Sequence, residues 1–244
     1  MFYQEIICLA NSRKLKGRCV AGKNCKTRKW IRPVSSSETG ELTIDQIMYE
    51  SKIVPEILDI IRVPCSCAKP TFYQCENVEV INAKWQYIGK YPIEKIDDLC
   101  ERPKTLWVNG NGFNDRISVE YLQNNKLKTS LMLIKATAFK IKRQDETVNG
   151  MFGPYERKKI RALFTYNAVE YDLGITDPII EHEYKNKEEG EYLFPFDKIY
   201  LCISLGTPYR GYCYKLVAAI IGVNSFHSEV QENTFKEATE EIIF

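Results

Sequence analysis

The residues with the clearest chemical potential lie near the N-terminus, in the stretch LANSRKLKGRCVAGKNCKTRKWIRPVSS (9–36). Lys and Arg side chains neutralise phosphates, and Trp30 offers a face on which a nucleic-acid base can stack. An acid-free basic stretch around one aromatic residue is typical of a phosphate-binding surface, but a solvated connection with Trp30 buried in a core would have the same composition. The stretch contains no acid and nine basic residues: Arg13, Lys14, Lys16, Arg18, Lys23, Lys26, Arg28, Lys29 and Arg32.

The two ends of this stretch carry directional side chains rather than simple charge. Asn11, Ser12 and Arg13 come first, Arg18 follows, and Arg32 closes the stretch. Amide and guanidinium groups make oriented, partly bidentate hydrogen bonds, which suit recognition of a defined chemical group. Alternatively, the Asn and Ser satisfy backbone groups at a strand end, and the last Arg pairs with an acid elsewhere in the chain.

Two further polar segments lie in the second half of the chain, WVNGNGFNDRIS (107–118) and SLGTPYRGYCY (204–214). The Asn-Gly pairs predict tight turns, so the polar residues after them either contact a ligand or support the loop. Tyr212 and Tyr214 share one face of a strand, and this face either stacks bases or packs the core. We therefore interpret the following as nucleic-acid-binding residues: Asn11, Ser12, Arg13, Lys14, Arg18, Lys26, Lys29, Trp30, Arg32, Asn114, Arg116 and Tyr212.

The sequence gives little support for metal binding or catalysis. The nine cysteines do not form the paired CxxC spacing of a structural zinc site and are better explained as buried free thiols in a reducing compartment. P-loop, GxSxG, HExxH and zinc-deaminase motifs are absent from the sequence. We expect no metal, no cofactor and no catalytic residues, although a metal site assembled only by the fold stays open.

Charge and hydropathy narrow the class of protein. The formal net charge is only +2, but nine of the 34 Lys and Arg lie in the basic stretch, so 25 remain against 32 Asp and Glu. A mildly acidic body with one positive surface can focus its field on a single partner. The sequence has neither a secretory signal pattern nor an apolar run long enough to cross a membrane, so we expect a cytoplasmic protein without membrane contact.

Hydrophobic periodicity predicts a mainly β protein with a few short helices. In the second half, three strands, a helix and two closing strands follow the order of an OB barrel, and the first half has a similar order with insertions. We therefore expect two tandem OB-like barrels, the first over residues 1–126 with helical insertions and the second over 127–244. The predicted strands are 5–12, 29–35, 56–67, 76–89, 130–143, 159–176 (with a hairpin turn at 167–168), 198–205 and 211–223, and the predicted helices are 43–52, 92–101, 118–125 and 177–189.

The order of several motifs resembles the dual OB-containing domain family of prokaryotes. The most specific segments are LANSRK with GRCVAG near the start and ISLGTPYRGYCYKLVAAII near the end; WIRPVS, GEL, LDI, QCENV, NDRIS and GITDP lie between them in the family's order. The resemblance runs from residue 9 to 221. It implies two tandem OB-like barrels, recognition of nucleic acid or nucleotides, and a setting of defence against mobile elements, and it supplies no catalytic residues.

From these observations we expect a non-catalytic protein that binds single-stranded or structured DNA or RNA. A partner protein encoded in the same gene neighbourhood is a further expectation. Two alternatives stay open. One is a sensor or enzyme in which NSRK, RP and NDR converge on a small nucleotide in an enclosed cleft. The other is a protein-interaction adaptor, because OB barrels also serve as docking modules and a fold alone does not fix a function.

Overall fold

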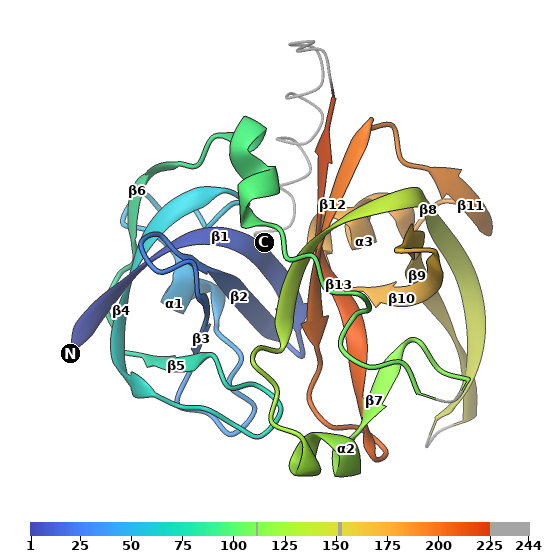
Figure 1. The fold of residues 1–244 in the computed structure, drawn as a ribbon, viewed down its shortest axis with the longest axis horizontal. Helices are drawn as coiled ribbons and strands as arrows, with labels where there is room; N and C mark the ends of the chain where they lie inside the picture. The colour runs from blue at the N-terminus through green and yellow to red at the C-terminus, as the bar shows by residue number, and fades with distance from the viewer. Residues whose placement is uncertain (111, 151–152, 225–244) are drawn as a thin grey trace.

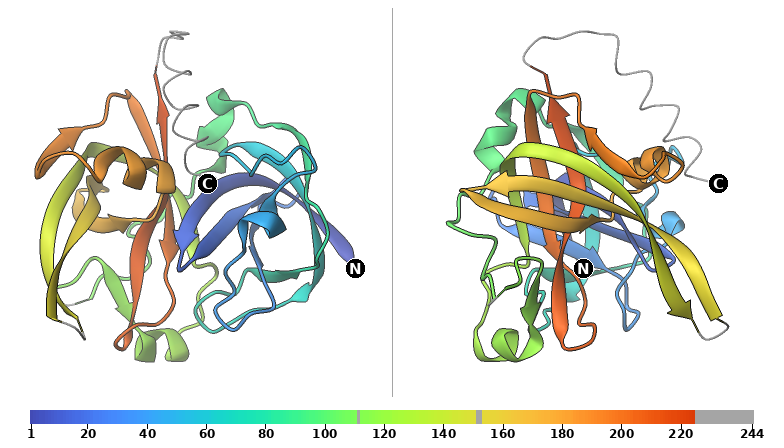
Figure 2. Two further views of the ribbon diagram at one scale, coloured as in Figure 1. Left: turned by 180° about the vertical axis from the view of Figure 1, so that it is seen from behind. Right: turned by 90° about the vertical axis from the view of Figure 1, so that its right-hand side faces the viewer.

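The structure is a computed structural model that describes residues 1–110, 112–150 and 153–224. In this part of the chain, two β-barrels lie side by side, the first built by the N-terminal half and the second by the C-terminal half (Figures 1 and 2). β-Strands dominate and the helices are short, as the sequence predicts. None of the helices in the described residues is long and apolar enough to cross a membrane.

The first barrel has the strand order of an OB fold. Its elements are β1 (Phe2–Lys14), β2 (Gly17–Asn24), β3 (Trp30–Val34), α1 (Ile44–Ile47), β4 (Asp59–Ala68), β5 (Asn77–Val80), β6 (Gln86–Lys90) and the 3-10 helix η1 (Ile93–Leu99). The sheet runs β1-β2-β3-β5-β4 and closes because β4 also pairs with β1. The β3–β5 pair is parallel, as the Greek-key connection of an OB barrel requires. The extra strand β6 pairs with β4.

The second barrel repeats this order. Its elements are β7 (Arg116–Ser118), α2 (Val119–Asn124), β8 (Leu131–Gly150), β9 (Gly153–Tyr166), β10 (Val169–Ile175), α3 (Pro178–Tyr184), β11 (Gly190–Leu193), β12 (Lys198–Leu205) and β13 (Tyr212–Val223). The sheet runs β10-β9-β8-β12-β13 and closes through a parallel β10–β13 pair. The short strands β7 and β11 pair with β13 and β8. The predicted tandem OB architecture is confirmed. The division after residue 126 stays a prediction, and β7, which precedes it in the chain, pairs with β13 of the second barrel.

Local sequence signals mark several element ends correctly. Ser118 caps α2, because its side chain accepts a hydrogen bond from the backbone N–H of Tyr121. The predicted turn between β9 and β10 falls at Asn167 and Ala168, which adopt φ angles of 48° and 60°. Asp177 caps α3 by accepting hydrogen bonds from two backbone N–H groups of its first turn.

Asp177→Ala is expected to lower the free energy of unfolding by about 2–3 kcal/mol, the sum of a lost helix cap and an orphaned buried N–H group. The second effect arises because the other carboxylate oxygen accepts the backbone N–H of Ile220 on β13 at 3.2 Å. Urea unfolding of this variant measures the loss. Ser118→Ala is the matched control, because it removes only a cap; an equal loss in both variants would contradict the contribution of the β13 contact.

The structure corrects two strand assignments. Residues 17–24 form a full strand, β2, where the sequence pattern gives only a connection, because the buried pair Val20 and Ala21 is too short a run to show periodicity between basic residues. Gly22 permits this strand to approach β1, since an added Cβ would lie 2.1 Å from the Ile7 carbonyl oxygen. The predicted strand 76–89 is instead two strands, β5 and β6, separated by a turn that buries Trp85.

A shared apolar core joins the two barrels. Strand β1 is apolar on both faces, so Ile6 and Cys8 point into the first barrel, while Ile7 and Leu9 pack in a different core. That second core also contains Trp30 and several residues of β8, β12 and β13: Leu131, Leu133, Tyr200, Cys202, Ala218, Ala219 and Ile221. The outer face of β1, β2 and β3 is therefore covered by the second barrel.

Candidate nucleic-acid interface

Trp30, predicted to stack bases, is buried in the core between the barrels. Its side chain is 6% exposed, and its indole N–H donates a hydrogen bond to Glu101 Oε1 at 2.8 Å. The Lys23 Nζ lies 5.2 Å from the ring centroid and forms an ion pair with the same carboxylate. A base cannot reach this ring, so the stacking role expected from the sequence does not fit the structure, and the residue serves packing instead.

Arg32, predicted to recognise a ligand, is also buried and pairs with an acid of the protein. Its Nε donates to Glu76 Oε1 at 3.1 Å, and its Nη2 donates to Ser130 Oγ at 2.9 Å and to Ser204 Oγ at 3.3 Å. Because both serines belong to the second barrel, this side chain connects the two barrels. Burial alone would raise the pKa of Glu76, but Arg32 and the hydrogen bonds from Ser130 hold it below its usual value.

Asn11, Ser12 and Arg13 also make contacts within the protein, although the buried Asn11 Oδ1 has no hydrogen-bond partner among the described residues. The side-chain amide of Asn11 donates to the Pro55 carbonyl at 2.8 Å, and Ser12 Oγ donates to the Cys19 carbonyl at 3.3 Å. Arg13 forms a two-point ion pair with Glu181 of α3 in the second barrel: its Nε donates to Oε2 at 2.7 Å and its Nη2 to Oε1 at 2.5 Å. These side chains therefore stabilise the connection between strands and barrels.

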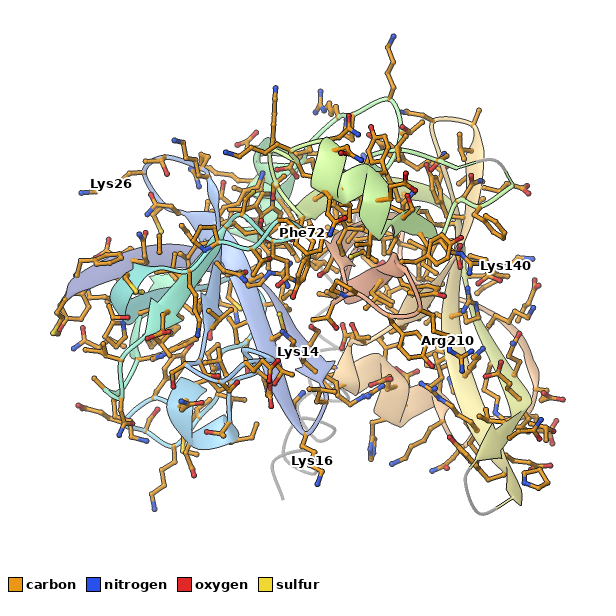
Figure 3. All side chains as sticks on the ribbon, turned by 90° about the horizontal axis from the view of Figure 1, so that it is seen from below. Lys14, Lys16, Lys26, Phe72, Lys140 and Arg210 are labelled. Carbon is orange, nitrogen blue, oxygen red and sulfur yellow. The ribbon has the colours of Figure 1, made fainter. Side chains whose placement is uncertain are left out.

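The lysines of the stretch differ in how far solvent reaches them. Lys14 and Arg18 are half-buried, and burial lowers the pKa of both. Lys26 and Lys29 are exposed on the turn between β2 and β3, and neither has an ion-pair partner among the described residues. Figure 3 shows Lys26 on the first barrel, well separated from Arg210 on the second. The turn lysines remain available to a phosphate.

The predicted residues Asn114, Arg116 and Tyr212 come together on the second barrel. Strand β7 pairs with β13, with Ser118 opposite Tyr212 and Arg116 opposite Tyr214. On β13, Tyr212 and Tyr214 point outward because successive strand residues alternate between faces. The loop before β7 is held to β10 by a hydrogen bond from the Asn114 amide to the Glu170 carbonyl at 3.2 Å.

Arg116 organises the rings around it. Its guanidinium carbon lies 4.3 Å from the ring centroid of Phe113, 5.4 Å from that of Tyr212 and 5.3 Å from that of Tyr214. Its Nη1 donates to the Tyr214 hydroxyl at 3.3 Å, and its Nε donates to Asp115 Oδ1 at 2.9 Å. Each such contact between a cation and a ring contributes about 0.5–1 kcal/mol at an exposed site, so one side chain fixes three rings in place.

The tight turn between β12 and β13 extends this arrangement. Tyr209 lies 6.5 Å from Tyr214 between ring centroids, and the Arg210 guanidinium lies 5.2 Å from the Tyr209 ring. Arg210 and Gly211 adopt positive φ angles of 49° and 81°, which turn the chain back into β13. We call these residues the aromatic–arginine cluster: Phe113, Arg116, Tyr209, Arg210, Tyr212 and Tyr214.

Two rings of the aromatic–arginine cluster face solvent. Phe113 is 47% exposed and Tyr209 is 58% exposed, so both rings are accessible to a ligand. The turn that carries Tyr209 is predicted from the sequence, whereas Phe113 is not among the predicted binding residues. The signal for Phe113 was its place directly after two Asn-Gly turns, where an apolar side chain has little core to join.

The structure does not bring the predicted arginines to one enclosed cleft. Arg13, Arg32 and Arg116 bind Glu181, Glu76 and Asp115 respectively, and no partner is shared. Within the described residues, no group of three or more His, Cys, Asp or Glu side chains is arranged to hold a metal ion, and all nine cysteines are free. The geometry therefore favours an open aromatic surface over a small-nucleotide pocket.

The family match below agrees with the tandem OB fold. The dual OB-containing domain family matches residues 4–220. A search among curated proteins returned no match. Among solved structures, a murine DNA-binding protein bound to double-stranded DNA is 8% identical, with a TM-score of 0.33 over 92% of this chain and 100% of that one. The Ifi202 HINa domain in complex with a 20-bp double-stranded DNA is 10% identical, with a TM-score of 0.32 over 91% and 96%.

Proposed function

The chain belongs to the dual OB-containing domain family, and from this premise we propose that it binds single-stranded nucleic acid through the aromatic–arginine cluster of its second barrel. OB barrels bind oligonucleotides at the face of their second and third strands and at two loops, one of which joins the fourth and fifth strands. In the second barrel that loop connects β12 to β13 and carries Tyr209 and Arg210. The exposed rings beside this loop are the observation that carries the proposal.

The chemistry of the aromatic–arginine cluster favours a single strand over a duplex. Stacking on protein rings needs the flat face of a base, which a duplex hides between neighbouring base pairs. Phe113 and Tyr209 offer such faces to solvent. Arg210, exposed beside Tyr209, supplies a positive charge for the phosphate that links two stacked nucleotides.

The first barrel is less suited to this role. The outer face of its second and third strands, where Ala21 and Trp30 lie, packs against the second barrel. The corresponding face of the second barrel, β9 and β10, lies on the side away from the first (Figure 1). Lys159 and Arg161 on β9 are already paired there, with Glu146 and Asp172. In the aromatic–arginine cluster, two exposed rings occur together with Arg210, which has no ion-pair partner among the described residues.

The turn lysines of the first barrel have a supporting role in this proposal. Lys26 and Lys29 carry positive charge into solvent, and the exposed ring of Tyr3 lines the same surface hollow as Lys26. Such charges raise the rate at which a polyanion meets the protein and add to the salt dependence of binding. Defence against mobile elements, a partner protein and a cytoplasmic location stay predictions.

Binding of fluorescently labelled 20-nucleotide DNA and RNA strands, followed by anisotropy over a salt series, tests the proposal. Phe113→Ala and Tyr209→Ala are each expected to weaken binding roughly 10-fold, because stacking is worth about 1–3 kcal/mol per base. Comparing the two strands also shows whether DNA or RNA binds more tightly. Affinity for either strand should fall as salt rises, since the Lys and Arg side chains that neutralise phosphates release the counterions condensed on the strand.

Tyr87→Ala is the matched control, because this tyrosine is 52% exposed but lies on β6 of the first barrel. It should bind like the unchanged protein. If Phe113→Ala and Tyr209→Ala also bind normally while charge reversal at Lys26 and Lys29 abolishes binding, the interface lies on the first barrel and the proposed site is wrong. If neither strand binds at any salt concentration, the function itself is wrong.

A further inference from the structure

Lys215 is a buried lysine directly beneath the aromatic–arginine cluster. It lies on β13 between the outward residues Tyr214 and Leu216, and its own side chain points into the barrel with 1% of the residue exposed. A lysine at a core position is costly unless its ammonium group finds acceptors. The acceptors of this ammonium group therefore identify the part of the chain that Lys215 holds in place.

The acceptors of Lys215 belong to the segment that carries Phe113. Its Nζ donates to the Val108 carbonyl at 2.9 Å and to Asn109 Oδ1 at 2.9 Å. Its backbone N–H donates to the Asp115 carbonyl at 2.7 Å. One residue of β13 thus holds both ends of the segment 108–115, which leads directly into the first residue of β7.

Among the described residues, few charged or titratable groups surround this ammonium. The negative charge of Asp115 favours the protonated amine. The ring centroid of Tyr171, on β10, lies 5.7 Å from Lys215 Nζ. Arg116, at the start of β7, forms an ion pair with Asp115. Burial lowers the pKa of Lys215 to about 8, partly opposed by Asp115. The group is therefore mostly charged at pH 7 and loses its proton over a mildly alkaline range.

We propose that Lys215 is a positioning residue whose side chain and backbone hold the described residues of this segment, 108–110 and 112–115, against β13, so that nucleic-acid binding by the aromatic–arginine cluster depends on it. This inference rests on the proposed function. A charged amine in a core cannot lose its acceptors cheaply, so the segment stays docked and Phe113 stays beside Arg116. A neutral amine tolerates the loss of an acceptor, and the segment can then move away.

Loss of the Lys215 proton raises the free energy of unfolding, whereas it lowers the affinity for nucleic acid. Because the folded-state pKa lies below the unfolded value of 10.5, the unfolded chain binds more protons between about pH 8 and 10.5. Deprotonation of Lys215 therefore makes unfolding less favourable as the pH rises through this range. Falling affinity together with rising stability is a signature that a merely structural lysine would not give.

The test compares the unchanged protein with Lys215→Arg and Lys215→Met in binding to a labelled 20-nucleotide oligodeoxyadenylate, whose bases do not titrate between pH 7 and 9.5. The affinity of the unchanged protein is expected to fall about fivefold over this range, because charge-assisted hydrogen bonds are about twice as strong as neutral ones. Lys215→Arg, which keeps its charge, should give a flat profile. Lys215→Met should bind weakly at both pH values, and Lys198→Met, an exposed lysine on β12, should behave like the unchanged protein.

Hydrogen exchange at pH 7 provides a readout that needs no nucleic acid. Peptides covering 108–115 should exchange faster in Lys215→Met than in the unchanged protein, while peptides from the first barrel should not change. Equal exchange in this segment, or equal pH profiles for the unchanged protein and Lys215→Arg, would overturn the inference. Faster exchange with no oligonucleotide binding by any form would support the positioning role and refute the proposed function.

Discussion

Replacing Arg32 with alanine is expected to lower the free energy of unfolding by about 3–5 kcal/mol, because it leaves a buried carboxylate without its cation. The Glu76 side chain is only 4% exposed, so water cannot replace the lost guanidinium. Ser130 and Ser204 of the second barrel lose a donor at the same time. The substitution therefore weakens the first barrel and its contact with the second, and urea unfolding followed by circular dichroism measures the loss.

Arg13→Ala is the matched control for Arg32→Ala. Its ion pair with Glu181 also connects the two barrels, but the Arg13 side chain is 49% exposed, so its loss should cost less than about 1 kcal/mol. The pKa of Glu76 lies below its usual value of 4.5, so the contribution of Arg32 is present at neutral pH and disappears as the pH falls below that value. Equal losses for the two variants at pH 7 would contradict the role of burial.

The helix cap, the turn and the strand pattern were predicted correctly because each depends on residues close together in the chain. The cap at Ser118 and the turn at Asn167 each depend on interactions within a few residues, and the strand pattern of the second half depends on alternation along one segment. These signals, with the family resemblance, were sufficient for the OB order. Strand β2 was missed because its outward residues, such as Ala21, are buried by another barrel rather than exposed to solvent.

The roles of individual basic residues depended on partners that sequence spacing does not reveal. Arg32 meets Glu76 across 44 positions and Ser130 across 98 positions, so nothing near it in the chain marks it as a core residue. The aromatic–arginine cluster has the same origin, because Arg116 and Tyr214 meet across 98 positions when β7 joins β13. Residue type indicated that these side chains could bind a phosphate or a base, and only the barrel contacts decide which remain accessible.

Arg116→Ala is expected to weaken binding of a single-stranded oligonucleotide about 100-fold, because the stacking positions on three rings depend on one guanidinium. Without it, Phe113 and Tyr212 lose the group that lies between them and no longer present one continuous surface. The Asp115 carboxylate also loses its partner and repels the phosphates of the strand. Anisotropy titration measures the effect, and Arg102→Ala, which removes an exposed arginine outside the aromatic–arginine cluster, should change affinity little.

Arg116→Lys separates the two ways in which this residue can act. If Arg116 contacts a phosphate, only its charge matters, so Arg116→Lys would bind like the unchanged protein. In that case Arg116→Ala would reduce the slope of log affinity against log salt concentration by about one. If Arg116 holds the rings in place, its planar guanidinium is needed, because this group stacks on aromatic faces and donates in fixed directions. In that case Arg116→Lys should bind roughly 10-fold more weakly, with the salt slope unchanged. Because Nε and Nη1 of Arg116 already donate to Asp115 and the Tyr214 hydroxyl, and the guanidinium lies against three rings, we expect the second result. Full recovery with lysine would instead make Arg116 a phosphate ligand and leave the rings to be held by the strand pairing of β7 alone.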